Sequence, residues 1–183
     1  MGRFIRFLLW FVLLLLVSAA VYFFITYRDY SGIYGDKQQE RDTTILAVVH
    51  HDAIDHVTSI NDIEYQHKVI NKWESGFAYT FYLEGGKIYQ MHRIGDCSGH
   101  AFGYNCNSVS VCIHQPDKYE PRTRINLWIL LWFLKIKYGL TSDEIVGHGE
   151  LPNQNFTTCP EMDMDSLRNM FFDVKKIEKI WEE

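Results

Sequence analysis

The sequence predicts an α/β domain with a mixed central sheet that is flanked by helices and preceded by one transmembrane helix. A long uncharged apolar run opens the chain, and segments typical of strands then alternate with helical patterns, with glycines between several of them. The chain has 183 residues, enough for one domain with a sizeable core and an appendage. Its formal net charge of −5 argues against a nucleic-acid partner, which usually needs a basic face.

The apolar run extends from Phe7 to Ile25, and only Ser18 interrupts it. About 20 such residues suffice for a helix to cross the core of a bilayer. Arg3 and Arg6 precede the run, so the positive-inside tendency predicts a cytoplasmic N-terminus. The rest of the chain would then lie outside the membrane, in the periplasm or at the cell surface.

An alternative for this run is a signal peptide cleaved at the small residues 17–19, which would leave a secreted protein. The apolar sequence continues past this point, which favours an uncleaved anchor. We therefore expect a membrane anchor over residues 1–27, a polar linker over residues 28–42 and one domain over residues 43–183.

Within the domain, apolar and aromatic segments predict five strands, at residues 43–49, 77–83, 87–92, 108–114 and 144–146. The Glu-Gly-Gly sequence between the second and third strands indicates a hairpin. Helical spacing of apolar residues predicts helices at residues 59–74, 125–138 and 165–181, and residues 116–124 are expected to be a loop. The helix at 125–138 is apolar almost all round, which predicts that it is buried against the sheet.

Two histidines and a cysteine suggest a metal site. His148 follows the last strand, and a polar loop leads from it to Cys159. Imidazole and thiolate together suit zinc, and a catalytic zinc site needs a third protein ligand and an open fourth position. We expect His50, at the end of the first strand, to be that ligand. Neighbouring strand side chains point to opposite faces, so only one of His50 and His51 can face the site.

If Cys159 binds a metal, the other three cysteines are Cys97, Cys106 and Cys112. They can form at most one disulfide, which export from the cytoplasm would favour. The sequence does not select the pair.

Four blocks of sequence carry a resemblance to a known family: VVHHDA, GFAYTFYL, GHAFGYNCNSVSV and IVGHGELPNQNFTTCP. Their order and spacing resemble the zinc N-acetylmuramoyl-L-alanine amidases of type 2, a group that includes the phage lysozyme-amidases and the peptidoglycan recognition proteins. The similarity covers residues 43–172. It implies the mixed-sheet fold of that family and zinc-dependent hydrolysis of the amide between N-acetylmuramic acid and L-alanine in peptidoglycan.

The resemblance also implies roles for individual residues. His50, His148 and Cys159 match the three zinc ligands. Tyr79 matches the tyrosine whose hydroxyl faces the catalytic water. Thr157 falls where family members carry a lysine or threonine that helps to polarise the substrate carbonyl.

Two further positions match the substrate groove of the family, namely His100 and Asn107. The chain also departs from the family at three places, one of which is Ser110 in place of a usual glycine, a small residue for a small one. Cys112 stands where one branch has a glutamate base, so we assign no carboxylate base. The loop between His148 and Cys159 holds ten residues, which is longer than in the phage enzymes.

Two other functions remain open from the sequence. One is a protein that binds peptidoglycan, or muropeptide fragments of it, without catalysis. The other is a cysteine hydrolase with Cys159 as nucleophile and His148 as base.

Overall fold

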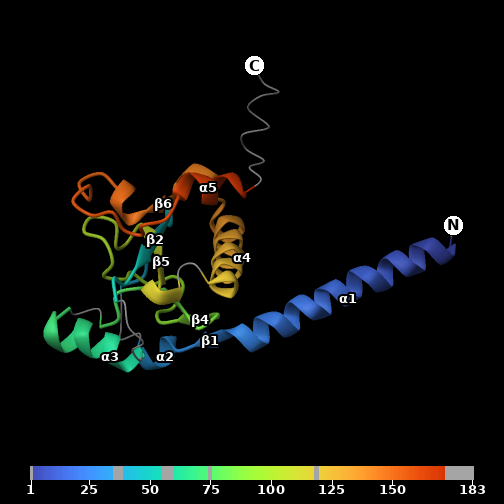
Figure 1. The fold of residues 1–183 in the computed structure, drawn as a ribbon, viewed down its shortest axis with the longest axis horizontal. Coiled ribbons are helices and arrows are strands. Elements are labelled where there is room, and N and C mark those ends of the chain that lie inside the picture. Colours follow the sequence, from blue (N-terminus) through green and yellow to red (C-terminus); the bar gives the residue numbers. More distant parts are fainter. Residues whose placement is uncertain (1, 35–38, 55–59, 74–75, 118–119, 172–183) are drawn as a thin grey trace, which may run out of the picture.

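The computed structural model describes residues 2–34, 39–54, 60–73, 76–117 and 120–171. Its first element is α1 (Gly2–Thr26), a single helix that projects from the rest of the protein (Figure 1). Within it, the 23 residues Phe4–Thr26 are apolar and long enough to cross a membrane by length and composition, a test that a signal sequence near the N-terminus also passes.

The central sheet is built from β1 (Tyr27–Asp29), β2 (Leu46–His51), β3 (Phe81–Glu84), β4 (Lys87–Gln90), β5 (Ser108–Ile113) and β6 (Ile145–Gly147). The strand order is β1-β4-β3-β5-β2-β6. Neighbouring strands run parallel, except that β3 and β4 form an antiparallel hairpin. The predicted mixed sheet and its hairpin are confirmed.

The segment expected to be a linker, residues 28–42, contains regular structure. Tyr27–Asp29 form β1, which follows α1 directly and pairs with β4. The Tyr27 hydroxyl donates to Gln90 at 2.5 Å, and a short helix, α2 (Ser31–Tyr34), follows. The backbone hydrogen bonds of β1 therefore attach the end of α1 to the edge of the sheet. The limits of the three expected parts remain a prediction.

One face of the sheet is covered by α4 (Pro121–Tyr138), which begins four residues before the predicted start. Residues 121–124 were expected to be loop. They are helical because the Glu120 carboxylate caps the helix by accepting from the Thr123 N–H at 2.7 Å, and Pro121 suits the first helical position. The helix ends as predicted at Gly139, whose φ of 64° is left-handed.

The main core lies between this face and α4. Alternate residues of β2, Ala47 and Val49, point into it and meet leucines of α4, with α5 (Met164–Asn169) closing one side. The helix predicted over residues 165–181 is present only as α5, which ends at Asn169, so the described residues 170–171 are not helical, contrary to the prediction. Residues 172–183 lie outside the described part.

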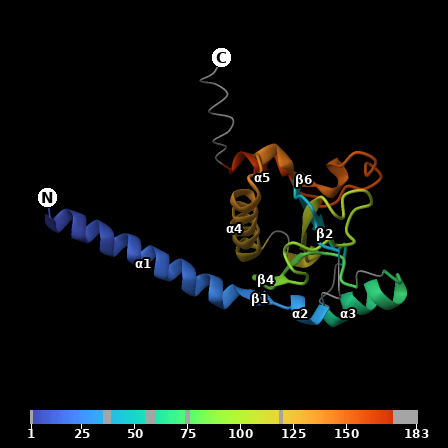
Figure 2. The ribbon, with the colours of Figure 1, turned by 180° about the vertical axis from the view of Figure 1, so that it is seen from behind.

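The opposite face of the sheet carries Val48 and His50, the other alternating residues of β2. It is covered by α3 (Ile60–Tyr65), a π-helical turn (Gln66–Ile70) and the long loops of the domain. The helix predicted over residues 59–74 is therefore present but is divided, and residues 55–59 and 74–75 lie outside the described part. Figure 2 shows the same arrangement from behind, with α4 on one side of the sheet and α3 on the other.

Candidate metal centre and substrate cleft

His50 and His148 meet because their strands are parallel neighbours. β2 pairs with β6 in a register that puts Val49 opposite Gly147, so the next residue of each chain lies at the same edge of the sheet. The two imidazole rings have centroids 4.6 Å apart. The carboxyl ends of parallel strands thus bring together two residues that are 98 positions apart in the sequence.

Cys159 is brought to this edge by the loop that follows His148. The Gly149 N–H donates to the Cys159 carbonyl at 2.7 Å, and the His51 N–H donates to the Cys159 sulfur at 3.3 Å. The loop packs so closely that a Cβ at Gly149 would lie 2.3 Å from the Thr157 carbonyl oxygen. A Cβ at Gly147 would lie 2.7 Å from Pro160. Glycine is therefore required on both sides of His148.

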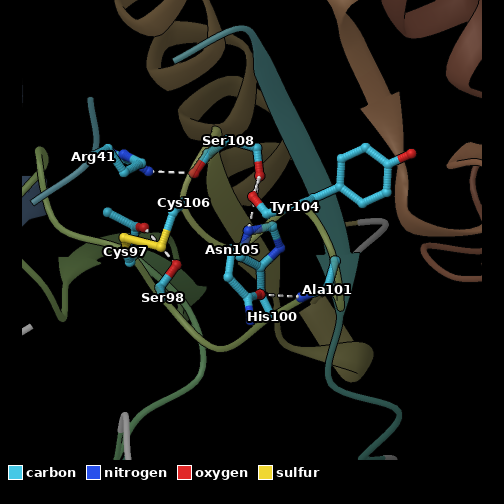
Figure 3. Close-up of a disulfide and its surroundings, with 10 residues drawn as sticks. Arg41, Cys97, Ser98, His100, Ala101, Tyr104, Asn105, Cys106 and Ser108 are labelled. Atoms are coloured by element: carbon cyan, nitrogen blue, oxygen red, sulfur yellow. Dashed lines mark hydrogen bonds between the residues drawn. A yellow bond between two sulfur atoms is a disulfide. The ribbon is translucent and has the colours of Figure 1, made fainter. Parts of the chain in front are cut away.

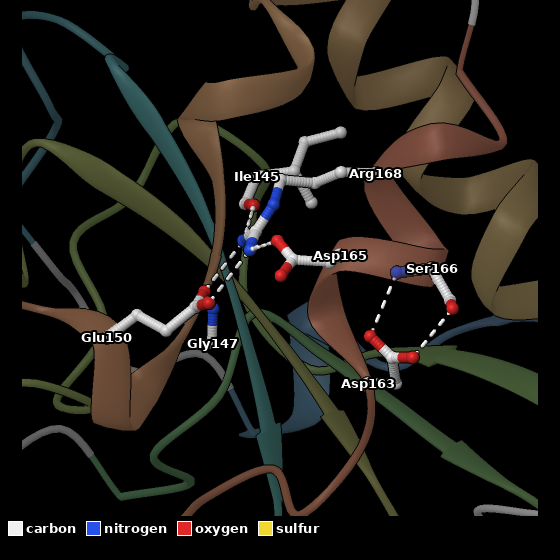
Figure 4. Close-up of polar contacts among 7 residues, drawn as sticks. All are labelled: Ile145, Gly147, Glu150, Asp163, Asp165, Ser166 and Arg168. Atoms are coloured by element: carbon white, nitrogen blue, oxygen red, sulfur yellow. Dashed lines mark hydrogen bonds and ion pairs between the residues drawn. The ribbon is translucent and has the colours of Figure 1, made fainter.

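A second contact holds the turn that carries His148. The Glu150 carboxylate accepts from the Gly147 N–H at 2.7 Å and from both terminal nitrogens of Arg168 at 2.8 and 2.9 Å (Figure 4). Arg168 belongs to α5 and also pairs with Asp165. The ion pair with Arg168 helps to hold the pKa of Glu150 below its usual value. The paired guanidinium and carboxylate fasten the turn around His148 to the end of α5.

The three side chains fit a zinc ion. One ligand atom from each of His50, His148 and Cys159 lies within 4.8 Å of the others. His50 Nδ1 is 3.9 Å from the Cys159 sulfur. Two ligands of a tetrahedral zinc are separated by about 3.6 Å when one is nitrogen and the other sulfur. Two neutral imidazoles with one thiolate form a donor set that zinc prefers and leave a fourth position open.

A chain of hydrogen bonds orients His50. Its Nε2 is 3.0 Å from His100 Nδ1. His100 Nε2 is 3.0 Å from Ser108 Oγ, which donates to the Tyr104 carbonyl at 2.6 Å (Figure 3). A carbonyl can only accept, so the hydroxyl proton points toward Tyr104. His100 Nε2 therefore donates to Ser108 Oγ, and His100 Nδ1 accepts from His50 Nε2–H. This leaves His50 Nδ1 without a proton and directed at the cysteine sulfur. Metal-binding histidines are commonly held by such a partner.

Burial keeps the histidines of this hydrogen-bonded series neutral. The pKa of His50 lies well below its ordinary value, chiefly because the ring is buried and further because His100, His148 and His51 are close. Burial lowers the pKa of His100 to about 3. The pKa of His148 is also lowered by burial, against a hydrogen bond with Gln154 that raises it.

Tyr79 lies beside the three predicted ligands. It belongs to an irregular segment before β3 rather than to the predicted strand, and its ring centroid is 5.2 Å from that of His50. Its pKa is raised well above the ordinary value, first by burial and then by the nearby Cys112 and Cys159. The phenol is therefore protonated at neutral pH and can donate a hydrogen bond.

The three remaining predicted site residues, Thr157, Asn107 and His100, differ in their position relative to the cleft beside the site. Thr157 is half-buried in the loop before Cys159, and its hydroxyl oxygen accepts from the Cys159 N–H at 3.1 Å. Asn107 lies just before β5 and is not among the described residues that line the cleft next to the site, whereas its neighbour Asn105 is. His100 lines that cleft and also bonds to His50.

The cleft has a volume of about 680 Å³ and runs from His148 and His100 toward Trp73 and Lys72. A disulfide between Cys97 and Cys106 forms part of its wall (Figure 3), which resolves the pairing that the sequence left open. Cys112 is free and buried. Two aromatic side chains, Phe102 at 89% exposure and Phe156 at 77%, belong to the loops beside the cleft and His148.

Asp52, for which no role was predicted from the sequence, directly follows β2, the strand that carries His50. Its carboxylate accepts from the Tyr82 hydroxyl at 2.7 Å, lies 2.7 Å from His114 Nδ1 and also accepts from two backbone N–H groups. The side chain is almost fully buried. The one indication in the sequence of a role for Asp52 was its position directly after the two histidines. A carboxylate buried at that position requires several hydrogen-bond partners.

The fold and the site define a mixed α/β protein with a candidate His-His-Cys metal site at one end of a cleft. The chain belongs to the N-acetylmuramoyl-L-alanine amidase family, whose model (Amidase_2) matches residues 40–162. No curated protein sequence matches it significantly.

Several solved structures share the fold. The amidase LysC from Clostridium intestinale URNW is 21% identical, with a TM-score of 0.67, over 79% of this chain and 96% of that one. The endolysin of Thermus scotoductus MAT2119 bacteriophage Ph2119 is 18% identical, with a TM-score of 0.64, over 78% and 97%. Drosophila PGRP-LB is 21% identical, with a TM-score of 0.58, over 74% and 88%. The predicted family and fold class are confirmed.

Proposed function

We propose that this protein is a zinc-dependent N-acetylmuramoyl-L-alanine amidase that hydrolyses the amide between N-acetylmuramic acid and L-alanine in peptidoglycan or its muropeptide fragments. The observation that carries the proposal is the convergence of His50, His148 and Cys159 beside Tyr79 at one end of the cleft. Family membership supports the choice of bond. A variant of Drosophila PGRP-LB has been solved in complex with tracheal cytotoxin, which supports a muropeptide ligand for the cleft.

Each residue of the site has its own role in the proposed hydrolysis. When bound, zinc supplies a Lewis acid that polarises a carbonyl and lowers the pKa of a water to about 7. Tyr79 donates a hydrogen bond where negative charge develops on the carbonyl oxygen, and Thr157 supports it. Tyr79 also passes a proton toward the leaving amine. His100, which lines the cleft, binds substrate and also holds the ring of His50. For Asn107 only the family resemblance supports a role in substrate binding, because it is not among the described residues that line the cleft.

We further propose that α1 is an uncleaved membrane anchor, with the N-terminus in the cytoplasm and the domain on the outside, where peptidoglycan lies. Support comes from the length and composition of α1 and from the arginines that precede its apolar part. Mass spectrometry of the membrane-extracted protein tests this point. A mass that lacks the first residues of the chain would instead mean a cleaved signal and a secreted enzyme.

The activity is tested by digesting purified peptidoglycan with the full-length protein in detergent, with and without a chelator. Free stem peptides that begin with alanine should appear in the mass spectrum, disappear with the chelator and return with added zinc. Activity that survives removal of all zinc would favour the cysteine hydrolase instead. Retention of peptidoglycan without release of peptides would indicate a binding protein.

His148→Ala is the matched variant for this assay, because it removes a predicted ligand at the surface of the cleft. It should lose both zinc and hydrolysis. Zinc bound as tightly as in the wild type would mean that the ligand set is wrong.

A further inference from the structure

The outer side of α4 carries an apolar stripe that the sheet does not cover. Ile125, Phe133 and Ile136 are 51%, 49% and 72% exposed, and Ile129 between them is half-buried. At 100° per residue these four side chains fall within an arc of about 80° on the helix. A contiguous apolar stripe of this kind marks a contact surface, whereas single exposed apolar residues do not.

The charges of α4 are all positive. Pro121–Tyr138 contains two arginines and two lysines but no aspartate or glutamate, although the chain as a whole has a net charge of −5. Arg122 is exposed one turn before Ile125, and Lys137 is exposed next to Ile136. The apolar stripe therefore has a basic residue at each end, a pattern that fits an apolar interior bordered by anionic headgroups.

The end of α1 packs against the same helix. The Tyr22 hydroxyl donates to Asn126 Oδ1 at 2.8 Å. Phe23 and Tyr27 line a cavity of about 160 Å³ together with Ile129 and Phe133 of α4. Since β1 follows α1 without a break and pairs with β4, these contacts set the direction in which α1 leaves the domain.

That direction places α4 toward the membrane. In both views α1 extends outward on the side of the sheet that α4 covers, and α4 stands across the line of α1 (Figures 1 and 2). A bilayer crossed by α1 would therefore lie alongside the outer face of α4. His50 lies on the opposite face of the sheet.

We propose that the outer face of α4, defined by Ile125, Ile129, Phe133 and Ile136 with Arg122 and Lys137, contacts the surface of the bilayer that α1 spans. This inference rests on the proposed anchoring by α1. The stripe enters the interfacial layer, the two basic residues meet anionic headgroups, and the domain is held in one orientation. The cleft then opens away from the membrane, toward the space that holds peptidoglycan.

The experiment uses the full-length protein in liposomes that contain phosphatidylglycerol. A photo-crosslinking amino acid, p-benzoylphenylalanine, is introduced at position 133 or 136 in separate preparations. Positions 102 and 156, both exposed phenylalanines on the cleft side, are the matched controls, and position 10 reports on α1 itself. Lipid adducts are quantified by mass spectrometry after irradiation.

We expect lipid adducts at positions 10, 133 and 136, several-fold above those at 102 and 156. The yield of lipid adducts at position 136 should fall several-fold in liposomes of phosphatidylcholine alone, which lack anionic headgroups, and in a variant with both Arg122→Gln and Lys137→Gln. The yield at position 10 should not change in either case. Both of these side chains are exposed, so digestion of peptidoglycan by this variant verifies that it is folded.

Three results would overturn the inference in different ways. Lipid adducts at position 10 but not at 133 or 136 would support the anchor but would show that the outer face of α4 does not contact the bilayer. Crosslinked protein dimers at 133 and 136 would mean that a second copy covers the stripe. The absence of lipid adducts at position 10 would mean that α1 is not a membrane anchor, and the proposed contact of α4 with the bilayer would then also be wrong. The amidase activity would be unaffected by this result, because the digestion assay tests it separately.

Discussion

At the scale of single residues, the proposed metal site depends on side chains that are not themselves among the proposed ligands. The carbonyl of Tyr104 ends the chain of hydrogen bonds through Ser108 and His100, and it thereby determines which nitrogen of His50 faces Cys159. Such an arrangement lowers the cost of binding, because the ring is already oriented before the ion arrives.

His100→Ala should lower zinc affinity by about 10- to 100-fold, as loss of a partner of a metal ligand typically does. Ser108→Ala should have a smaller effect in the same direction. Ser110→Ala is the control, since Ser110 lies two residues along the same strand and bonds to Thr80 and Ser98 instead. Competition with a chromophoric chelator measures all three. Wild-type zinc affinity in His100→Ala, with only KM changed, would confine His100 to substrate binding.

Tyr79→Phe should keep the fold and the zinc content while losing hydrolysis by about 10²- to 10³-fold, the usual effect of removing one donor to a developing oxyanion. The phenylalanine ring retains the contact with His50. The measurement is the rate of stem-peptide release, with bound zinc determined on the same sample. A rate equal to that of the wild type would remove Tyr79 from the mechanism.

At the scale of elements, two strand ends and one loop together form the site. β2 and β6 deliver the two histidines, and the segment from Gly149 to Cys159 folds back on them. The close approach of Thr157 to Gly149 leaves no room for any side chain there. The glycines on both sides of His148 are therefore required by packing.

Gly149→Ala should displace the 157–160 segment, because the added Cβ would lie 2.3 Å from a carbonyl oxygen. We expect a loss of about 1–3 kcal/mol in the free energy of unfolding, as for other overpacked sites, and weaker zinc binding. Gly95→Ala is the matched control, since nothing lies within 4 Å of a Cβ there. Thermal denaturation and zinc titration test both variants. Equal behaviour of the two would mean that the loop adapts.

At the scale of the whole molecule, the sheet separates two kinds of surface. One face holds the apolar core, with α4 beyond it, and the other holds His50, Cys112 and the loops of the cleft. This division separates the outer face of α4, which is apolar and basic, from the face that holds the cleft.

Buried neutral histidine should make the whole fold sensitive to acid. Burial lowers the pKa of His67 to about 4, and its Nδ1 accepts from the Ala78 N–H at 3.2 Å. The unfolded chain binds a proton there near pH 6.5 and the folded chain does not. Stability is therefore highest above pH 6.5 and falls as the pH drops toward 4, by on the order of 3 kcal/mol at most.

The test compares thermal denaturation of the chelator-treated wild type with His67→Gln between pH 7 and about 4. Glutamine keeps an acceptor but does not titrate, so the variant should lose less stability over this range. An unchanged slope would assign the acid sensitivity to other groups.

Much of the fold was predictable from local patterns. The mixed sheet, the hairpin, the long apolar helix at the N-terminus and the end of α4 at Gly139 all follow from periodicity, turn residues and capping. The start of α4 and the break of the helix at α3 were not predicted, because a carboxylate cap at Glu120 and a π-helical turn leave little trace in hydrophobic spacing.

The residue types of the proposed metal site were also visible in the sequence, since histidines at strand ends and a cysteine after a polar loop are few in this chain. The chain alone could not supply the disulfide partner of Cys97, the network around Asp52 or the double role of His100, because each depends on contacts between segments that are distant in sequence. The same holds for α4. Residues 125–138 are apolar almost all round, and only their packing decides that one side is buried while Ile125, Phe133 and Ile136 stay exposed.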